Sequence, residues 1–150
     1  MREEVYEFLR EYGFSKEELT SFEKENEKMF FTNLVEVNKN IDFLTNKGLV
    51  KEEIINVFRN NPFMITVKNN RLDALDKIYI EDLKFDINSL KTLIINNPET
   101  YTTSPIELEK NINYLKKHNC TMEVIRSFII NNNQVIIMDF NEFEKAVKFN

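Results

Sequence analysis

The sequence predicts an all-α protein, a short, right-stacked helical-repeat solenoid, and three observations support this class. Glycine and proline are scarce, with two and three residues in a chain of 150, which leaves little material for the tight turns of an all-β fold. Apolar residues recur at the three- and four-residue spacing of an amphipathic helix. The same pattern of helix ends also returns about every 35 residues, which is typical of helical repeats.

The repeat is clearest between residues 6–19, "YEFLREYGFSKEEL", and residues 41–54, "IDFLTNKGLVKEEI", at a shift of 35. Gly13 and Gly48 correspond further along to Lys84 and Asn119, at spacings of 35, 36 and 35. The frame therefore predicts one domain over residues 1–150, built from about four units, approximately 1–32, 33–68, 69–103 and 104–138, with a terminal capping helix over 139–149.

Each unit is predicted to begin with a long helix that ends at this glycine-type turn. Glycine tolerates the left-handed geometry of a helix end without penalty, and Asn119 is the next best residue, whereas Lys84 is a poor one. A second helix should start two residues later. The segment from Ser15 to Glu18 has the pattern of a capping box, and the corresponding N-caps are Asp86 and Thr121.

The second helix of three units is predicted to end at a triplet, Asn-Asn-Pro at 60–62 and 96–98 and Asn-Asn-Asn at 131–133. Proline cannot continue the helical ladder, and we expect the asparagines to take left-handed terminal geometry. A short extended or 3₁₀-like piece should follow, with a buried residue at its middle: Phe30, Ile65, Tyr101 and Ile136. The next helix is predicted to begin at a polar cap: Asn33, Asn69, Ser104 and Asp139.

Composition limits the function classes. The net charge is −5, and division after residues 37, 73 and 109 gives −5, +2, −4 and +2, so a general attraction to nucleic acid is absent. One cysteine excludes an intrachain disulfide and a multi-cysteine zinc site. The chain start reads as neither a signal nor a transit peptide, and no apolar run is long enough to span a membrane. We therefore expect a cytoplasmic protein with no membrane partner.

Motif searches indicate no enzyme. The sequence has no zinc-protease, phosphate-loop or serine-hydrolase motif, so we expect no catalytic residue, cofactor, metal site or small-molecule substrate. The single histidine, His118, falls in a helix's last turn and is expected to cap it. Cys120 occupies the place of Phe14 and Leu49 in the repeat, which favours a core position. Acidic pairs lie in or near predicted first turns, where the helix dipole explains them.

At this point the residues resemble a known family. A helix ending in Leu-x-x-x-Gly, a glutamate-rich second helix start and an Asn-Pro turn are similar to the repeat of the mitochondrial transcription termination factor (mTERF) family. Residues 40–65, "NIDFLTNKGLVKEEIINVFRNNPFMI", carry the resemblance best, and a short bacterial or mobile-element relative fits them. The resemblance implies a curved solenoid without cofactor or enzymatic activity. It also implies nucleic-acid binding, often of duplex DNA, through a positively charged face, and in some members a role in protein complexes.

Two functions follow from these observations, ranked almost equally. The first is a protein-binding or inhibitory adaptor, which the overall acidity favours, with candidate acidic contacts Glu17, Glu18, Glu81 and Asp82. The alternative is an mTERF-like protein that grips double-stranded nucleic acid through two lysine and arginine stripes, with candidate contacts Arg59, Lys68, Arg71, Lys116, Lys117 and Arg126. No aromatic residue interleaves convincingly with these basic residues along the sequence.

Overall fold

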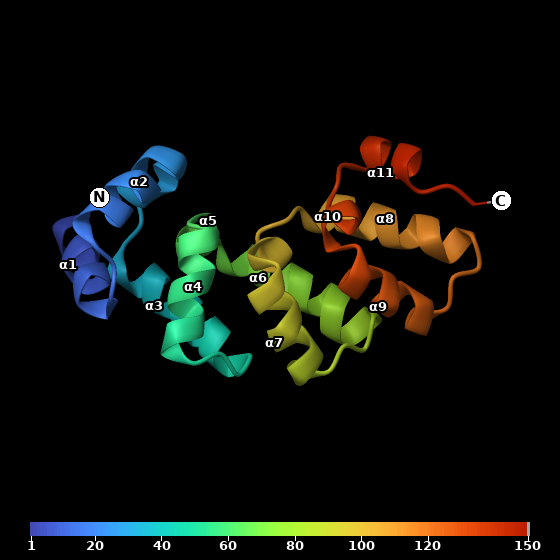
Figure 1. Cartoon of the computed structure of the whole chain (residues 1–150), viewed down its shortest axis with the longest axis horizontal. Helices are drawn as coiled ribbons and strands as arrows, with labels where there is room; N and C mark the ends of the chain where they lie inside the picture. The colour runs from blue at the N-terminus through green and yellow to red at the C-terminus, as the bar shows by residue number, and fades with distance from the viewer. Residues whose placement is uncertain (150) are drawn as a thin grey trace.

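The computed structural model describes residues 1–149, and within this range the chain is all-helical, with no strand. Helices follow one another in an elongated stack, with the two chain ends at opposite ends of the molecule (Figure 1). The predicted all-α helical-repeat architecture is therefore confirmed.

The helices up to residue 136 fall into four consecutive groups, which we call units. Each unit has a first helix, a second helix and a short helical turn. Unit 1 is α1 (Glu3–Tyr12), α2 (Lys16–Glu25) and η1 (Glu27–Phe30); unit 2 is α3 (Leu34–Asn46), α4 (Lys51–Asn60) and α5 (Phe63–Thr66). Unit 3 is α6 (Asn69–Asp76) continued by η2 (Lys77–Asp82), then α7 (Ile87–Asn96) and η3 (Pro98–Tyr101); unit 4 is α8 (Pro105–Lys117), α9 (Met122–Asn131) and α10 (Asn133–Ile136). The last helix, α11 (Phe140–Ala146), packs on α8. The exact division points of the chain, and its single domain, stay predictions.

The turn between the first and second helices has the predicted left-handed backbone in every unit. The φ angles are 139° at Gly13, 92° at Gly48, 59° at Lys84 and 64° at Asn119. At Gly13 the next unit adds a second constraint, because a Cβ there would lie 3.0 Å from the Cδ1 atom of Ile55. The backbone angle favours glycine at this turn, and a side chain there would also require the end of the Ile55 side chain to move.

The predicted N-caps of the second helices are also present. Ser15 Oγ accepts a hydrogen bond from the Glu18 amide, and the Glu18 carboxylate accepts one from the Ser15 amide, which completes the capping box. Asp86 and Thr121 each accept a bond from the amide three residues on. These contacts satisfy backbone donors that the first helical turn leaves without partners.

The asparagine triplets differ from the expectation. Asn61 and Asn97 have φ angles of −148° and −139°, so neither is left-handed, as is usual before proline. The Asn61 side chain instead forms hydrogen bonds between units. The amide of Asn61, with 5% of its surface exposed, donates to the Pro98 carbonyl at 2.9 Å and to Thr102 Oγ1 at 2.8 Å.

The same contact joins units 1 and 2. Asn26 precedes Asn61 by 35 residues, and its amide donates to the Pro62 carbonyl at 3.2 Å and to Thr66 Oγ1 at 2.8 Å. We call this pair of hydrogen bonds the asparagine clamp. Between units 3 and 4 the clamp is missing, because Ile137 occupies the place of the threonine, and the Asn97 side chain has no hydrogen bond to any residue among 1–149.

Two further details differ from the expectation. The first helix of unit 3 has its N-cap at Lys68 rather than Asn69, and it ends in a π-helical segment, η2. This segment holds the extra residue that makes the spacing from Gly48 to Lys84 one longer than its neighbours. Of the four residues expected to be buried in the short turns, Phe30 is 52% exposed, and Met29 fills the core in its place.

Candidate functional site

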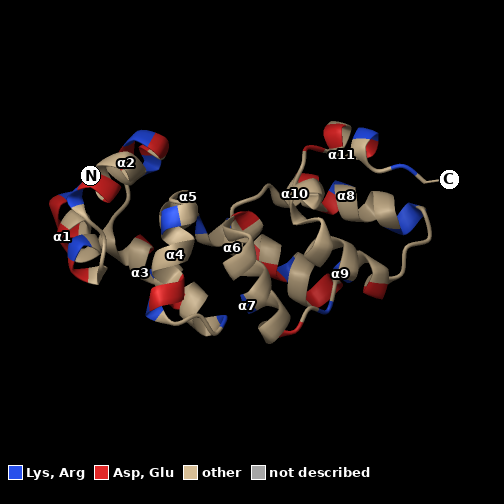
Figure 2. Cartoon of the chain, viewed as in Figure 1, with Lys and Arg blue, Asp and Glu red and all other residues tan. Residues whose placement is uncertain are grey.

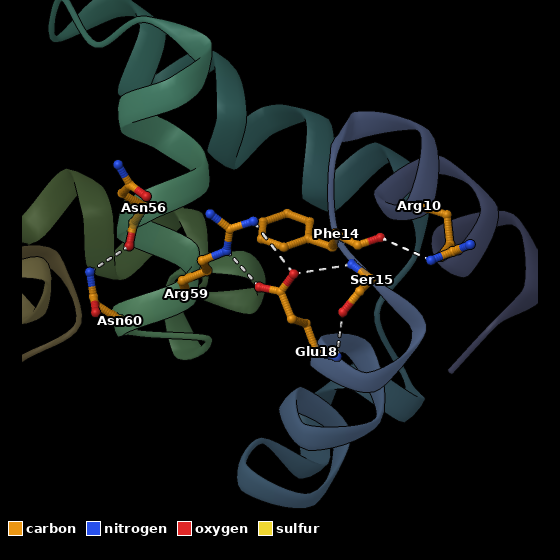
Figure 3. Close-up of polar contacts among 7 residues, drawn as sticks. All are labelled: Arg10, Phe14, Ser15, Glu18, Asn56, Arg59 and Asn60. Atoms are coloured by element: carbon orange, nitrogen blue, oxygen red, sulfur yellow. Dashed lines mark hydrogen bonds and ion pairs between the residues drawn. The ribbon is translucent and has the colours of Figure 1, made fainter.

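Of the basic residues predicted to form stripes, Arg59 makes the closest contact with another unit of the chain. Its guanidinium lies 2.6 Å from the Glu18 carboxylate and over the Phe14 ring, 5.9 Å from its centroid (Figure 3). The hydrogen bond from Arg59 lowers the pKa of Glu18, and the same bond raises the pKa of Arg59. Two side chains predicted to contact different partners therefore hold each other across units 1 and 2.

Other predicted basic contacts are also engaged within the chain. Arg71 Nη1 donates to the Thr102 carbonyl at 2.9 Å, and Arg126 Nη1 donates to the Leu83 carbonyl at 2.8 Å. Lys68 lies 3.7 Å from Glu36, in an exposed and therefore weak pair. Lys116 and Lys117 are exposed at the end of α8 and form no ion pair with the described residues. Of the six, Lys116 and Lys117 are therefore the two without a contact to an acceptor among the described residues.

The predicted acidic contacts are scattered. Glu17 lines a shallow surface hollow on α2, Glu81 lines another beside η2, and Asp82 is half-buried in the same π-helical segment. The part of the chain that the structure describes holds no cluster of three or more His, Cys, Asp or Glu side chains suited to a metal ion. The role of these acids in binding a partner stays a prediction.

A buried polar cluster lies between units 2 and 3 and was not predicted from the sequence. The Lys47 ammonium, on a residue that is 7% exposed, lies 3.1 Å from the Asp76 carboxylate and 4.3 Å from the centroid of Phe43. The Tyr101 hydroxyl donates to the same carboxylate at 2.7 Å. Burial and this contact raise the pKa of Tyr101. Every charged member of the cluster has a partner, and the contacts join units 2 and 3.

A groove lies at the C-terminal end of the chain, lined by residues of α8 and α11, two helices that lie side by side (Figure 1). Its volume is about 740 Å³, within the range of about 300–1,000 Å³ common for ligand sites. Three lysines and one glutamate give it a positive balance, and Figure 2 shows basic residues at the end of α8. We call it the α8–α11 groove, and its lining residues are Lys110, Asn113, Tyr114, Lys116, Lys117, His118, Phe140 and Glu144.

Aromatic rings stand among these lysines, in contrast to the expectation from the sequence. Tyr114 meets Phe140 edge-on, with centroids 5.9 Å apart at 72°, and its hydroxyl donates to the Val147 carbonyl at 3.3 Å. His118 stacks on Phe149 at 4.2 Å and 8°, and its Nδ1 lies 2.8 Å from the Tyr114 carbonyl. The His118 contact agrees with the predicted capping role, and the ring also forms one wall of the groove.

The sequence contained half of the signal for this groove. Lys110, Asn113, Tyr114 and Lys117 recur at the three- and four-residue spacing that places side chains on one helix face. The other half is Phe140, which reaches the lysines only because the chain reverses after α10 and lays α11 along α8. Such a return cannot be read from periodicity within a single unit.

The opposite end of the molecule carries a different feature, a set of exposed aromatic side chains. Phe31 is 79% exposed, Phe30 52% and Phe63 44%. They belong to η1, its C-cap and α5, which contact each other along one edge of the stack. Exposed aromatic groups of this kind are common in protein–protein interfaces.

The fold defines an all-α helical-repeat protein. The mTERF family model matches residues 1–80, more than half of the 150-residue chain, and the chain belongs to the mTERF family. Comparison with curated proteins finds no match. Within residues 1–149, no helix is long and apolar enough to cross a membrane.

Proposed function

We propose that this protein is a non-enzymatic nucleic-acid-binding module of the mTERF type, with its phosphate contacts at the α8–α11 groove. The observation that carries the proposal is the concentration of Lys110, Lys116 and Lys117 around one groove in a chain that is acidic overall. Membership of a family whose members typically bind nucleic acid supports the same function, and it moves this function ahead of the adaptor function that the overall acidity favours.

The internal contacts of the other basic side chains explain why the site lies at one end rather than along two stripes. A guanidinium that binds a carboxylate or a carbonyl within the chain keeps N–H donors for a phosphate, but the contact fixes its position and, at Arg59, offsets its charge with the Glu18 carboxylate. Arg59, Arg71 and Arg126 all make such contacts, whereas Lys116 and Lys117 can neutralise phosphates without such a constraint. Lys110 is exposed and lies 3.5 Å from the half-buried Glu107, so its charge is partly offset within the chain and it contributes less than Lys116 and Lys117. The absence of enzymatic activity and the cytoplasmic location stay predictions.

Fluorescence anisotropy with labelled single-stranded and duplex DNA and RNA tests the proposal. We expect binding at 50 mM salt, and the double variant Lys116→Gln/Lys117→Gln should abolish most of it. The matched control is Lys24→Gln/Lys28→Gln, which removes two exposed positive charges from unit 1, far from the groove. If none of these nucleic acids binds at low salt, or if both double variants weaken binding equally, the proposed site is wrong.

A second candidate function, the protein-binding adaptor, is favoured by the exposed aromatic edge of units 1 and 2. Residues 1–37, which include Phe30 and Phe31, carry a net charge of −5, which suits a partner with a basic rim around an apolar pocket. The test compares proteins recovered from nuclease-treated lysate by the wild type and by Phe31→Ser/Phe63→Ser. The control, Ile106→Ser/Val124→Ser, changes two other exposed apolar residues; a protein lost from both variants, or from neither, contradicts an adaptor role for this edge.

A further inference from the structure

The α8–α11 groove combines cations and aromatic rings in a small space at one end of the molecule. We propose that it takes single-stranded nucleic acid, with phosphates at Lys116 and Lys117 and a base against Phe140. This inference rests on the proposed function and names its substrate class, which differs from the duplex that the family resemblance implies.

The charges around the groove argue against a duplex. A module that binds duplex DNA covers about 600–1,000 Å² or more of its own surface and neutralises phosphates of both strands. Around this groove, such a footprint would extend onto the exposed carboxylates of Glu109 on α8 and Glu142 on α11. A single strand has only one row of phosphates, which can follow the lysines away from Glu109 and Glu142, so that Glu144 is the one glutamate that it meets in the groove lining.

The aromatic rings of the groove also favour a single strand. Single-strand sites combine a cationic groove with aromatic side chains on which bases stack. Phe140 is half-buried, lines the groove and meets Tyr114 edge-on rather than face to face. Tyr114 is held in place by its hydroxyl contact and by the rings of Phe143 and His118. The Asn113 amide, also in the lining, can donate to and accept from a base edge.

Three ligands with equal numbers of phosphates test the inference: oligo-dT of about a dozen nucleotides, an abasic strand of the same length, and a DNA hairpin. We expect oligo-dT to bind tightest and the abasic strand about tenfold more weakly, the order of one lost stacking contact. Three lysine contacts predict a shallow salt dependence, with a loss of roughly 20-fold between 50 and 200 mM salt for a single strand. A duplex held by six phosphate contacts would lose roughly 10³-fold over the same range.

The variant Phe140→Leu keeps an apolar side chain but removes the ring. It should weaken the binding of oligo-dT by about the same tenfold and leave the affinity for the abasic strand unchanged. Circular dichroism should confirm that the variant folds. Equal affinity for oligo-dT and the abasic strand, or equal losses for both in Phe140→Leu, would overturn the stacking contact. Tighter binding of the hairpin would overturn the single-strand inference and leave the proposed function standing, whereas no binding of any ligand would overturn both.

Discussion

The asparagine clamp predicts that one side chain holds two units together. In Asn61→Ala, the Pro98 carbonyl and the Thr102 hydroxyl lose a donor that lies 2.9 and 2.8 Å away. A buried neutral hydrogen bond contributes about 1 kcal/mol, and an acceptor left without a partner adds to the loss. We therefore expect the free energy of unfolding to fall by about 2–3 kcal/mol. For a chain of this length, that corresponds to a melting temperature lower by roughly 5–10 °C.

The repeat provides a matched control. Asn97 stands at the same place before proline in unit 3, with a similar backbone conformation, but its side chain has no hydrogen bond to any residue from 1 to 149. Asn97→Ala should therefore cost less than about 0.5 kcal/mol, the usual size for a substitution without such contacts. Urea denaturation followed by circular dichroism measures both variants. Equal losses would show that the asparagines act through helix termination, and the clamp would then have no energetic role.

Three other measurements test the contacts between units. Burial raises the pKa of Tyr101, so stability should be intact below the unfolded-state value of about 10 and fall as pH rises above it; Tyr101→Phe should reduce this alkaline loss in melting experiments. The bond from Arg59 lowers the pKa of Glu18, so its contribution should be present at neutral pH and vanish as pH falls below about 4. Glu18→Gln should accordingly cost at most about 1 kcal/mol at pH 7, and the difference from wild type should shrink as the pH falls through the lowered folded-state pKa of Glu18. Ile137→Thr gives the Asn97 side chain the missing acceptor. A double-mutant cycle of Ile137→Thr and Asn97→Ala should show a favourable coupling of about 1 kcal/mol between positions 97 and 137. Zero coupling would contradict a restored clamp.

The sequence predicted the backbone of the turns in the repeat, but it did not predict what the asparagine side chains contact. Positive φ angles at Gly13 and even at Lys84 followed from the frame alone, because neighbouring units impose the same helix end. The clamp of Asn61 could not be predicted in this way, since its acceptors belong to the next unit. Local propensity favours asparagine at any helix end, so it does not distinguish a termination role from a contact between units.

The candidate site shows the same limit. Lys116 and Lys117 were identified from their charge, but Phe140 joined them only through the return of α11 onto α8. Conversely, Arg59 and Glu18 looked like separate surface contacts, and stacking of units 1 and 2 pairs them. Charge and periodicity identify candidate side chains, whereas the packing of the units decides which of them still face a partner.

The π-helical segment η2 has a consequence for how relatives of this chain are recognised. An extra residue in an α-helix turns all following side chains by about 100°, yet here the wider turn absorbs it, and Phe85 enters the core as Leu49 does. The match to the family model ends at residue 80, inside this segment, although helices of the same kind continue to residue 146. The folded chain thus keeps the geometry of its repeat across the inserted residue. An alignment with relatives that places the insertion in η2 keeps Lys84 and Asn119 in register with Gly13 and Gly48, and so reaches the half of the protein that holds the groove.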